Sequence, residues 1–201
     1  MNWSAYLCPG DGAIDIGANV GTVTRRLAEA VGPTGHVLAV EPDPRALTVL
    51  RAVLITCPWV TILESAVIDS VGVAEMHLSQ DSRHNSLWKA NMKVDTDRAI
   101  TVPTTTLDRL AASVPNLKAI KVDTQGAESL VLSGARKTLT HDLVWHVEVW
   151  PHGLQNAGSS ADALLKVFRD AGYRPVDMTW DQILTAQHGS PHGATDVVFT
   201  R

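Results

Sequence analysis

The chain has few cysteines and no surplus of basic charge, and each shortage excludes a class of protein. Only two of its 201 residues are cysteine, Cys8 and Cys57, too few for a disulfide framework or a thiolate metal site. Lys and Arg total 17 against 21 Asp and Glu, a formal net charge of −4. Domains that bind nucleic acid through its phosphates usually carry a basic surplus. We therefore expect no disulfide-stapled fold and no nucleic-acid partner.

Long apolar runs are also missing from the sequence. No stretch approaches the roughly 20 apolar residues that a membrane-spanning helix needs, and residues 1–10 lack the basic and apolar regions of a secretory signal. We therefore expect a cytoplasmic protein with no membrane partner. Hydrophobic residues make up 45% and charged residues 19% of the chain, a balance that excludes disordered and low-complexity sequences.

The order of the apolar patterns predicts one doubly wound α/β domain that occupies residues 1–201. Strand-like runs alternate with helical patterns, which favours a mostly parallel sheet with helices on both faces. Strands are expected at residues 13–16, 36–40, 60–67, 117–122 and 143–149. Helices are expected at residues 22–31, from Pro44 onward, at 127–139, and from a capping box at 159–162 to Gly172. Residues 174–178 and 195–200 are expected to pair as an antiparallel hairpin at the sheet edge.

Residues 71–107 depart from this alternation, because the apolar pattern there has a period of two and the composition is polar. Residues 73–78 and 100–105 are expected to be extended and to flank a loop at residues 80–98. We interpret residues 76–102 as a flap. Residues 1–11 form a short extension before the first strand.

A turn with two glycines joins the first expected strand to the first expected helix. It reads Asp15-Ile16-Gly17-Ala18-Asn19-Val20-Gly21. Ligands of open α/β sheets bind beyond the carboxyl ends of the strands, where this turn lies, and glycine lets the backbone approach a ligand closely. Without a ligand, the same glycines would serve a tight strand–helix turn, so the turn alone leaves both interpretations open.

The spacing of the turn distinguishes two classes of nucleotide site. Dinucleotide enzymes need G-x-G-x-x-G to hold a pyrophosphate, but the corresponding positions are Gly17, Asn19 and Thr22. The pattern Asp-x-Gly-x-Asn-x-Gly resembles instead the first motif of class I methyltransferases, which bind S-adenosylmethionine. We expect that cofactor, with Asp15 near its ammonium group, and keep an NAD-dependent oxidoreductase as the weaker alternative. The candidate cofactor residues in the turn are Asp15, Gly17, Ala18, Asn19 and Gly21.

A second cofactor signal is the carboxylate that closes the second expected strand. Glu41 lies 20 residues after Gly21, and a carboxylate there can accept hydrogen bonds from both ribose hydroxyls of either cofactor. The alternative is a solvated acid at a strand end. Pro42 is expected to pack against the adenine and Ala66 to lie on the adenine side, whereas Asp43 is expected to cap the next helix.

Four segments, in the same order, resemble segments of the FkbM family of methyltransferases, and the resemblance covers nearly the whole chain. The segments are residues 17–21 with the family's "G-A-N-I-G", residues 103–108 with "V-x-T-L-D", residues 120–128 with "I-K-I-D-V-E-G-A-E" followed by "V-L-x-G-A" at 131–135, and residues 147–151 with "L-E-I-H-P". Gln125 departs from the family by replacing its usual acid, and Trp150 stands where His is frequent.

The resemblance implies a class I methyltransferase (Rossmann-like) fold, with a mostly parallel seven-stranded sheet and an antiparallel last strand, and methyl transfer from S-adenosylmethionine. The implied acceptor is a small molecule, usually a hydroxyl on a sugar, polyketide or other specialised metabolite. N-methylation and a catalytically idle cofactor-binding or scaffold protein remain alternatives, because little N-terminal chain is available to shape an acceptor pocket. A serine-rich turn in the family implies that Ser86 approaches the cofactor or acceptor. The sequence leaves the oligomeric state open, including a homodimer.

Three residues are candidates for catalysis. Side chains alternate along a strand, so Lys121 and Asp123 share a face. Asp123 is expected to point into the crevice beside the sulfonium, or otherwise to cap the following helix. A buried lysine needs a partner, and Glu148 on the next strand is expected to pair with Lys121 or to serve in catalysis. His152 is a candidate general base because of its near-neutral pKa, with an ordinary surface histidine as the alternative.

The remaining polar residues give weaker signals. Asp123, Glu148 and Glu128 offer oxygen ligands, but they form no dense cluster in the sequence, and we expect no metal. His146 is expected to lie in the core. His188 and His192 bracket a turn and are expected to be solvent-exposed rather than metal ligands. Trp88 is expected to cover the acceptor or to anchor the flap to the core.

Overall fold

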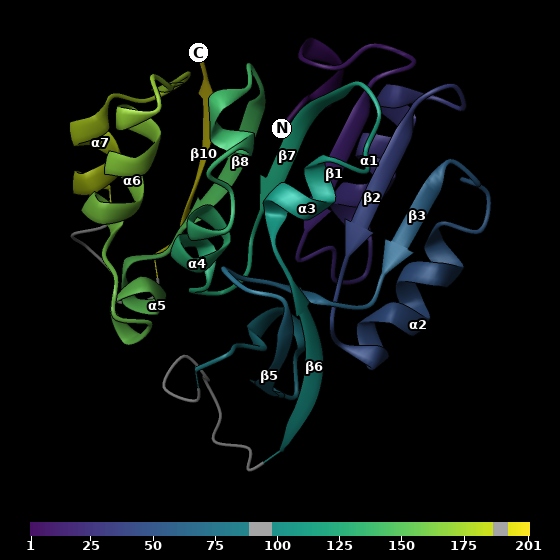
Figure 1. Cartoon of the computed structure of the whole chain (residues 1–201), viewed down its shortest axis with the longest axis horizontal. Coiled ribbons are helices and arrows are strands. Elements are labelled where there is room, and N and C mark those ends of the chain that lie inside the picture. Colours follow the sequence, from purple (N-terminus) through teal and green to yellow (C-terminus); the bar gives the residue numbers. More distant parts are fainter. Residues whose placement is uncertain (89–97, 187–192) are drawn as a thin grey trace.

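The computed structural model describes residues 1–88, 98–186 and 193–201, and a seven-stranded sheet lies at its centre (Figure 1). In the described residues the strand order is β3-β2-β1-β7-β8-β10-β9. Strand β10 is antiparallel to its neighbours β8 and β9, whereas the pairs from β3 to β8 are parallel. This confirms the predicted mostly parallel sheet with an antiparallel last strand. The strands are β1 (Gly12–Ile16), β2 (His36–Val40), β3 (Val60–Leu63), β7 (Leu117–Val122), β8 (Val144–Val149), β9 (Arg174–Pro175) and β10 (Thr195–Thr200).

Side-chain alternation along the strands divides the core between the two faces of the sheet. Ile14 of β1 packs in a cluster with Trp145 and Phe168, whereas Ala13 packs in a different cluster with Leu27. Successive side chains of a strand point to opposite faces, so both faces are buried under helices, as the apolar runs predict. The helices are α1 (Thr22–Val31), α2 (Pro44–Val53), α3 (Leu107–Ala111), α4 (Glu128–Ser133), α5 (Pro151–Asn156), α6 (Ala161–Asp170) and α7 (Trp180–Thr185).

The predictions succeed where local signals determine an element. Helix α1 has the predicted bounds and ends at Gly32, whose positive φ of 62° suits glycine. Helix α2 begins at Pro44, and Asp43 caps it by accepting a hydrogen bond from Arg45 N at 2.9 Å. Ser160 caps α6 by accepting from Ala163 N.

Two predicted elements are wrong in extent. Residues 60–67 form two strands, because β4 (Ala66–Val67) leaves the main sheet and pairs with a strand of a second sheet. The helix predicted at 127–139 ends at Ser133, and a 3₁₀ helix, Thr138–Thr140, follows separately. The predicted antiparallel pair at the sheet edge is confirmed, since β10 pairs with the edge strand β9, although α7 separates the two in sequence.

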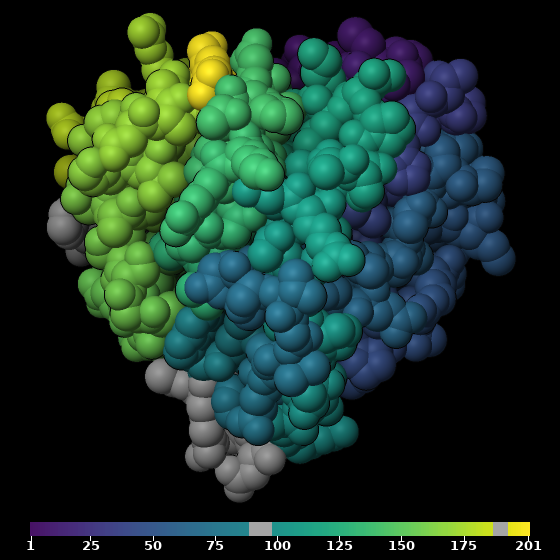
Figure 2. All heavy atoms as spheres, viewed as in Figure 1, coloured from purple at the N-terminus to yellow at the C-terminus, as the bar shows by residue number. Residues whose placement is uncertain are grey.

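The extended segments predicted at residues 73–78 and 100–105 are confirmed, and they form two strands of a second sheet. Its order is β4-β6-β5, with β5 (Gly72–His77) antiparallel to β6 (Ala99–Thr105). The arrowheads of β2 and β3 point toward it in Figure 1. In Figure 2 its blue and teal atoms form the lower part of this face. It therefore covers the carboxyl ends of the central strands, although residues 89–97 of the flap lie outside the described residues.

None of the helices in the described ranges combines the length and apolar composition needed to cross a membrane.

Gly17 follows β1 and lies against the backbone at the end of β7. Its φ is +78°, and a Cβ there would lie 1.8 Å from the backbone oxygen of Asp123. Only glycine fits this position, because a side chain would force the two strand ends apart.

Gly17→Ala is expected to lower the free energy of unfolding by more than about 3 kcal/mol, because it adds a backbone clash to left-handed strain. Gly158→Ala is the matched control: Gly158 has φ +76° with no atom within 4 Å of its Cβ position, so strain alone should cost about 1–2 kcal/mol. Urea denaturation measures both. Equal losses would contradict the tight approach at Gly17.

Candidate active site

A pocket of about 190 Å³ opens at the carboxyl ends of β1, β2 and β7. Its outer wall comes from the second sheet and from residues 78–88, which we call the covering segment. In an open α/β sheet this edge is where ligands bind. The lining residues are Ile16, Gly17, Asn19, Val40, Glu41, Pro42, Ser65, Ala66, Val67, Met76, Ser82, Arg83, Asn85, Ser86, Leu87, Asp123, Thr124, Gln125 and Ala127.

Most of the cofactor residues expected from the sequence meet at this pocket. Those that line it are Gly17, Asn19, Glu41, Pro42, Ala66, Ser86 and Asp123. Asp15, Ala18 and Gly21 do not line it. Ala18 packs instead in a buried cluster with Leu50 of α2, and Gly21 precedes α1 with a φ of 89°. These residues shape the turn from behind the pocket.

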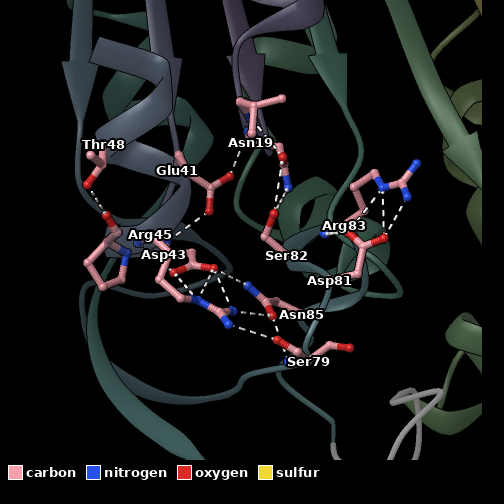
Figure 3. Close-up of polar contacts among 12 residues, drawn as sticks. Asn19, Glu41, Asp43, Arg45, Thr48, Ser79, Asp81, Ser82, Arg83 and Asn85 are labelled. Carbon is pink, nitrogen blue, oxygen red and sulfur yellow. Dashed lines mark hydrogen bonds and ion pairs between the residues drawn. The ribbon is translucent and has the colours of Figure 1, made fainter. Parts of the chain in front are cut away.

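Glu41 is a buried carboxylate at the pocket wall, with 6% of its surface exposed. Its Oε2 accepts a hydrogen bond from Asn19 N and its Oε1 one from Asp43 N, both at 2.8 Å (Figure 3). Burial raises the pKa of Glu41 to about 7, although the two backbone hydrogen bonds lower it in part. A carboxylate oxygen has more than one lone pair, so each can accept a further bond from a ligand hydroxyl.

Polar side chains connect the covering segment to the wall of the pocket that Asn19 and Glu41 form (Figure 3). Asn85 donates to Asp43 Oδ2 at 2.6 Å and accepts from Ser79 N at 2.8 Å. Arg45 donates to the backbone oxygen of Ser79 at 2.9 Å, and Asn19 donates to Ser82 Oγ at 3.2 Å. Sequence reasoning missed Ser82 and Asn85, because their partners lie about 40 to 60 residues away along the chain.

Lys121 has different partners from the one expected. Its ammonium lies 3.2 Å from Asp15 Oδ1 and 3.4 Å from Asp123 Oδ2, and it donates to the backbone oxygen of Gly17 at 3.0 Å. Burial lowers the pKa of Lys121, but the two carboxylates outweigh burial and raise it above its ordinary value. The predicted pair with Glu148 is wrong, because strand register places Asp15 beside Lys121 on β1.

Asp15 also serves the fold directly. Its Oδ2 accepts a hydrogen bond from Thr24 Oγ1 of α1 at 2.6 Å, and its side chain is fully buried. The carboxylate therefore links β1, α1 and Lys121 below the pocket.

Glu148 lies beside the pocket and is linked to Asp123 by Gln125. Gln125 Nε2 donates to Asp123 Oδ1 and to Glu148 Oε2, each at 2.9 Å. Burial, followed by the nearby charges of Asp123 and Glu128, raises the pKa of Glu148 to about 9. Glu148 is therefore protonated near neutral pH, which does not suit a general base.

Glu128 organises the turn after β7. It is fully buried, and its carboxylate accepts hydrogen bonds from Thr124 N at 2.9 Å and from Gly126 N at 3.0 Å. Burial raises its pKa, although these backbone bonds lower it in part. Within residues 1–88, 98–186 and 193–201, no group of three or more His, Cys, Asp or Glu is arranged to hold a metal ion.

His146, His152 and Trp88 are not among the residues that line the pocket. His152 is on α5, with Nε2 3.2 Å from Asn156 Nδ2 and its ring 5.8 Å from that of Trp150. His146 is half-buried against the ring of Trp3 at 5.7 Å. Trp88 donates its backbone N–H to Ser86 Oγ at 3.3 Å. The predictions for His188 and His192 fall outside the described residues.

Glu148→Gln is expected to weaken the pH dependence of stability. The folded chain keeps the Glu148 proton up to about pH 9, whereas the unfolded chain loses it near 4.5. The free energy of unfolding of the wild type therefore falls between these pH values through this group. A glutamine side chain cannot ionise, so the variant should gain stability relative to wild type from pH 5 to pH 8 in urea titrations.

Glu29→Gln is the control for this comparison, because the Glu29 side chain is 60% exposed on α1. It should keep the wild-type slope. An unchanged slope in Glu148→Gln would show that Glu148 is already ionised in the fold.

Comparison of the sequence with known proteins identifies the family of the chain. The family model described as "Methyltransferase FkbM domain" matches residues 15–175. The 2-O-methyltransferase NoeI of Sinorhizobium fredii is 29% identical over 142 residues, which cover 63% of this chain and 58% of NoeI. The chain thus spans little more than half the length of that relative.

Solved structures share the fold at low identity. Methyltransferase FkbM from Methylobacillus flagellatus superposes with a TM-score of 0.60 at 16% identity, over 96% of this chain and 44% of that one. A methyltransferase from Streptococcus mutans in complex with SAH has a TM-score of 0.56 at 15% identity, over 98% and 92% of the two chains.

These structural matches confirm the class I methyltransferase, Rossmann-like fold. Because the family model spans most of the sequence, the chain belongs to the FkbM family of methyltransferases, whose cofactor is S-adenosylmethionine.

Proposed function

We propose that this chain binds S-adenosylmethionine in the pocket and transfers its methyl group to a hydroxyl of a small molecule. The observation that carries the proposal is the position of Glu41. Glu41 directly follows β2 and lines the pocket, and its carboxylate accepts a hydrogen bond from the backbone of the Gly17–Gly21 turn. In a nucleotide site of this fold, an acid at the end of this strand accepts the ribose hydroxyls.

The chemistry of the lining fits the cofactor. Ala66, Val67 and Met76 supply an apolar wall suited to an adenine ring, and Glu41 supplies oxygen acceptors for the ribose. The turn carries Asn19 and Thr22 where a dinucleotide site needs glycine. A pyrophosphate is therefore poorly accommodated, which disfavours the NAD-dependent alternative.

Asp123 is the proposed proton acceptor. When bound, S-adenosylmethionine supplies an activated methyl group on a sulfonium cation. Asp123 lines the pocket and is held by Lys121 and Gln125. We assign it to take the proton of the acceptor hydroxyl as that oxygen gains the methyl group, so the carboxylate becomes neutral. Glu148 retains its own proton near neutrality, and His152 lies outside the lining.

A sugar hydroxyl is the proposed acceptor class. The support for an oxygen acceptor is the similarity to NoeI, a 2-O-methyltransferase, and the resemblance to the FkbM family implies a sugar among its usual acceptors. Because this chain spans little more than half of NoeI, N-methylation and a cofactor-binding protein without its own acceptor site remain the alternatives. An acceptor screen with sugars and with amines distinguishes these three outcomes.

Calorimetric titration with S-adenosylmethionine tests the cofactor assignment. Wild type is expected to bind it and not NAD. Glu41→Gln should weaken binding by at least about tenfold, since a hydrogen bond to a charged group contributes about 1.5–3 kcal/mol. Glu64→Gln is the matched control, because Glu64 also follows a strand but its side chain is 59% exposed. Binding of NAD alone would contradict the proposal.

The affinity for S-adenosylmethionine is expected to depend on pH through Glu41. Its pKa is raised to about 7 in the free protein, and the ionised carboxylate is the better acceptor for two hydroxyls. Affinity should therefore rise from pH 6 to pH 8 in wild type and stay flatter in Glu41→Gln. Equal pH dependence in both proteins would assign it to another group.

A further inference from the structure

The pocket holds two carboxylates with different surroundings. Among the described lining residues these are Glu41 and Asp123. Glu41 accepts hydrogen bonds from the backbone, whereas Asp123 is held by side chains. Arg83, the charged lining residue of opposite sign, has 76% of its side chain exposed and pairs with Asp81. A ligand cation in this pocket therefore has Asp123 as an available counter-ion once Glu41 is occupied by hydroxyl groups.

Lys121 does not cancel the charge of Asp123. One ammonium lies 3.2 Å from Asp15 and 3.4 Å from Asp123, so a single positive charge is shared between two carboxylates. The formal charges of these three groups sum to −1. Asp123 is the more exposed of the two carboxylates, with 35% of its side chain accessible against none for Asp15. The excess charge is therefore accessible from the pocket at Asp123.

Gln125 fixes the other oxygen of Asp123 without neutralising it. Its Nε2 lies 2.9 Å from Asp123 Oδ1 and 2.9 Å from Glu148 Oε2. An amide donates hydrogen bonds but carries no charge. The FkbM family usually has an acid at this position, and an ionised acid there would repel the Asp123 carboxylate. The amide of this chain therefore holds the carboxylate in place and leaves its charge intact.

The backbone of Gln125 is as constrained as its side chain. Its φ is +53°, a left-handed value that is uncommon for a non-glycine residue. Its carbonyl oxygen accepts a hydrogen bond from Ser86 Oγ of the covering segment at 3.0 Å. One residue thus connects the ends of β7 and β8 with the segment that covers the pocket.

We propose that Gln125 is a positioning residue that holds the charged Asp123 carboxylate toward the pocket, so that the site favours the cationic cofactor S-adenosylmethionine over its neutral product S-adenosylhomocysteine. This inference rests on the proposed function. The inference goes beyond that function because it attributes the difference in affinity between the cofactor and its product to the side-chain amide of Gln125. The charged groups around the amide's second partner, Glu148, are Asp123, Glu128, Asp196 and Lys121.

Paired calorimetric titrations with S-adenosylmethionine and S-adenosylhomocysteine test the proposal. Gln125→Gly removes the amide while keeping a residue that adopts positive φ without strain. Without the amide, the Asp123 carboxylate loses its fixed orientation. The binding affinity for S-adenosylmethionine is therefore expected to fall about fivefold, and the affinity for S-adenosylhomocysteine less than about twofold. Asp123→Asn should change the ratio of affinities in the same direction and by at least as much. Gln155→Ala, at an exposed glutamine on α5, should keep the wild-type ratio.

Each other outcome overturns the inference in a distinguishable way. Equal weakening of both ligands in Gln125→Gly would reduce Gln125 to a residue that only shapes the pocket. A changed ratio in Asp123→Asn but not in Gln125→Gly would keep the charge effect and reject the positioning role. Wild type that binds neither ligand would overturn the proposed function and this inference together. A thermal melt of Gln125→Gly near that of wild type confirms that the variant is folded.

Discussion

The site depends on one buried ammonium group. Lys121 is 4% exposed and lies between two carboxylates and a backbone oxygen, contributed by β1, the glycine turn and the end of β7. A buried charge is costly unless its partners are well placed. The position of Lys121 therefore requires Asp15, Gly17 and Asp123 to keep their present arrangement. Gly17 and Asp123 line the pocket, and Asp15 supports them from behind it.

The opposite wall depends on long-range polar contacts. Leu78 and Leu87 of the covering segment pack in an apolar cluster with the second sheet, and the contacts of Asn85 with Asp43 and of Ser82 with Asn19 connect the segment to the turns after β2 and β1. Asp43 serves twice, since it also caps α2. Helix α2, the end of β2 and the covering segment are thus connected at one carboxylate. This arrangement brings the second sheet over the carboxyl ends of the strands, so that the pocket has an outer wall.

The sequence predicts the elements with strong local signals and fails where distant partners decide. Gly32 and the Asp43–Pro44 pair determine the ends of α1 and α2 from within a few residues. Glu41 could be predicted as a candidate site residue for the same reason, because it follows an apolar strand at a known distance from the turn. Gly134 follows the last residue of α4, and only glycine fits there because a Cβ would lie 2.4 Å from the backbone oxygen of Ile68, a tertiary constraint that helical periodicity does not contain.

Register and side-chain reach account for the remaining errors. Lys121 and Glu148 lie on adjacent strands, but the residue opposite Lys121 on β8 is His146. A shared sheet face was therefore insufficient to identify the partner. The bridge formed by Gln125 depends on a left-handed backbone at a residue type that rarely adopts it, so it is visible only in the structure.

The most direct test of this account is a crystal structure of the protein with S-adenosylhomocysteine. The account predicts the ligand in the pocket, with its ribose hydroxyls hydrogen-bonded to the Glu41 carboxylate and its adenine against Pro42 and Ala66. A ligand bound elsewhere, or one in the pocket whose ribose does not contact Glu41, would contradict the central claim.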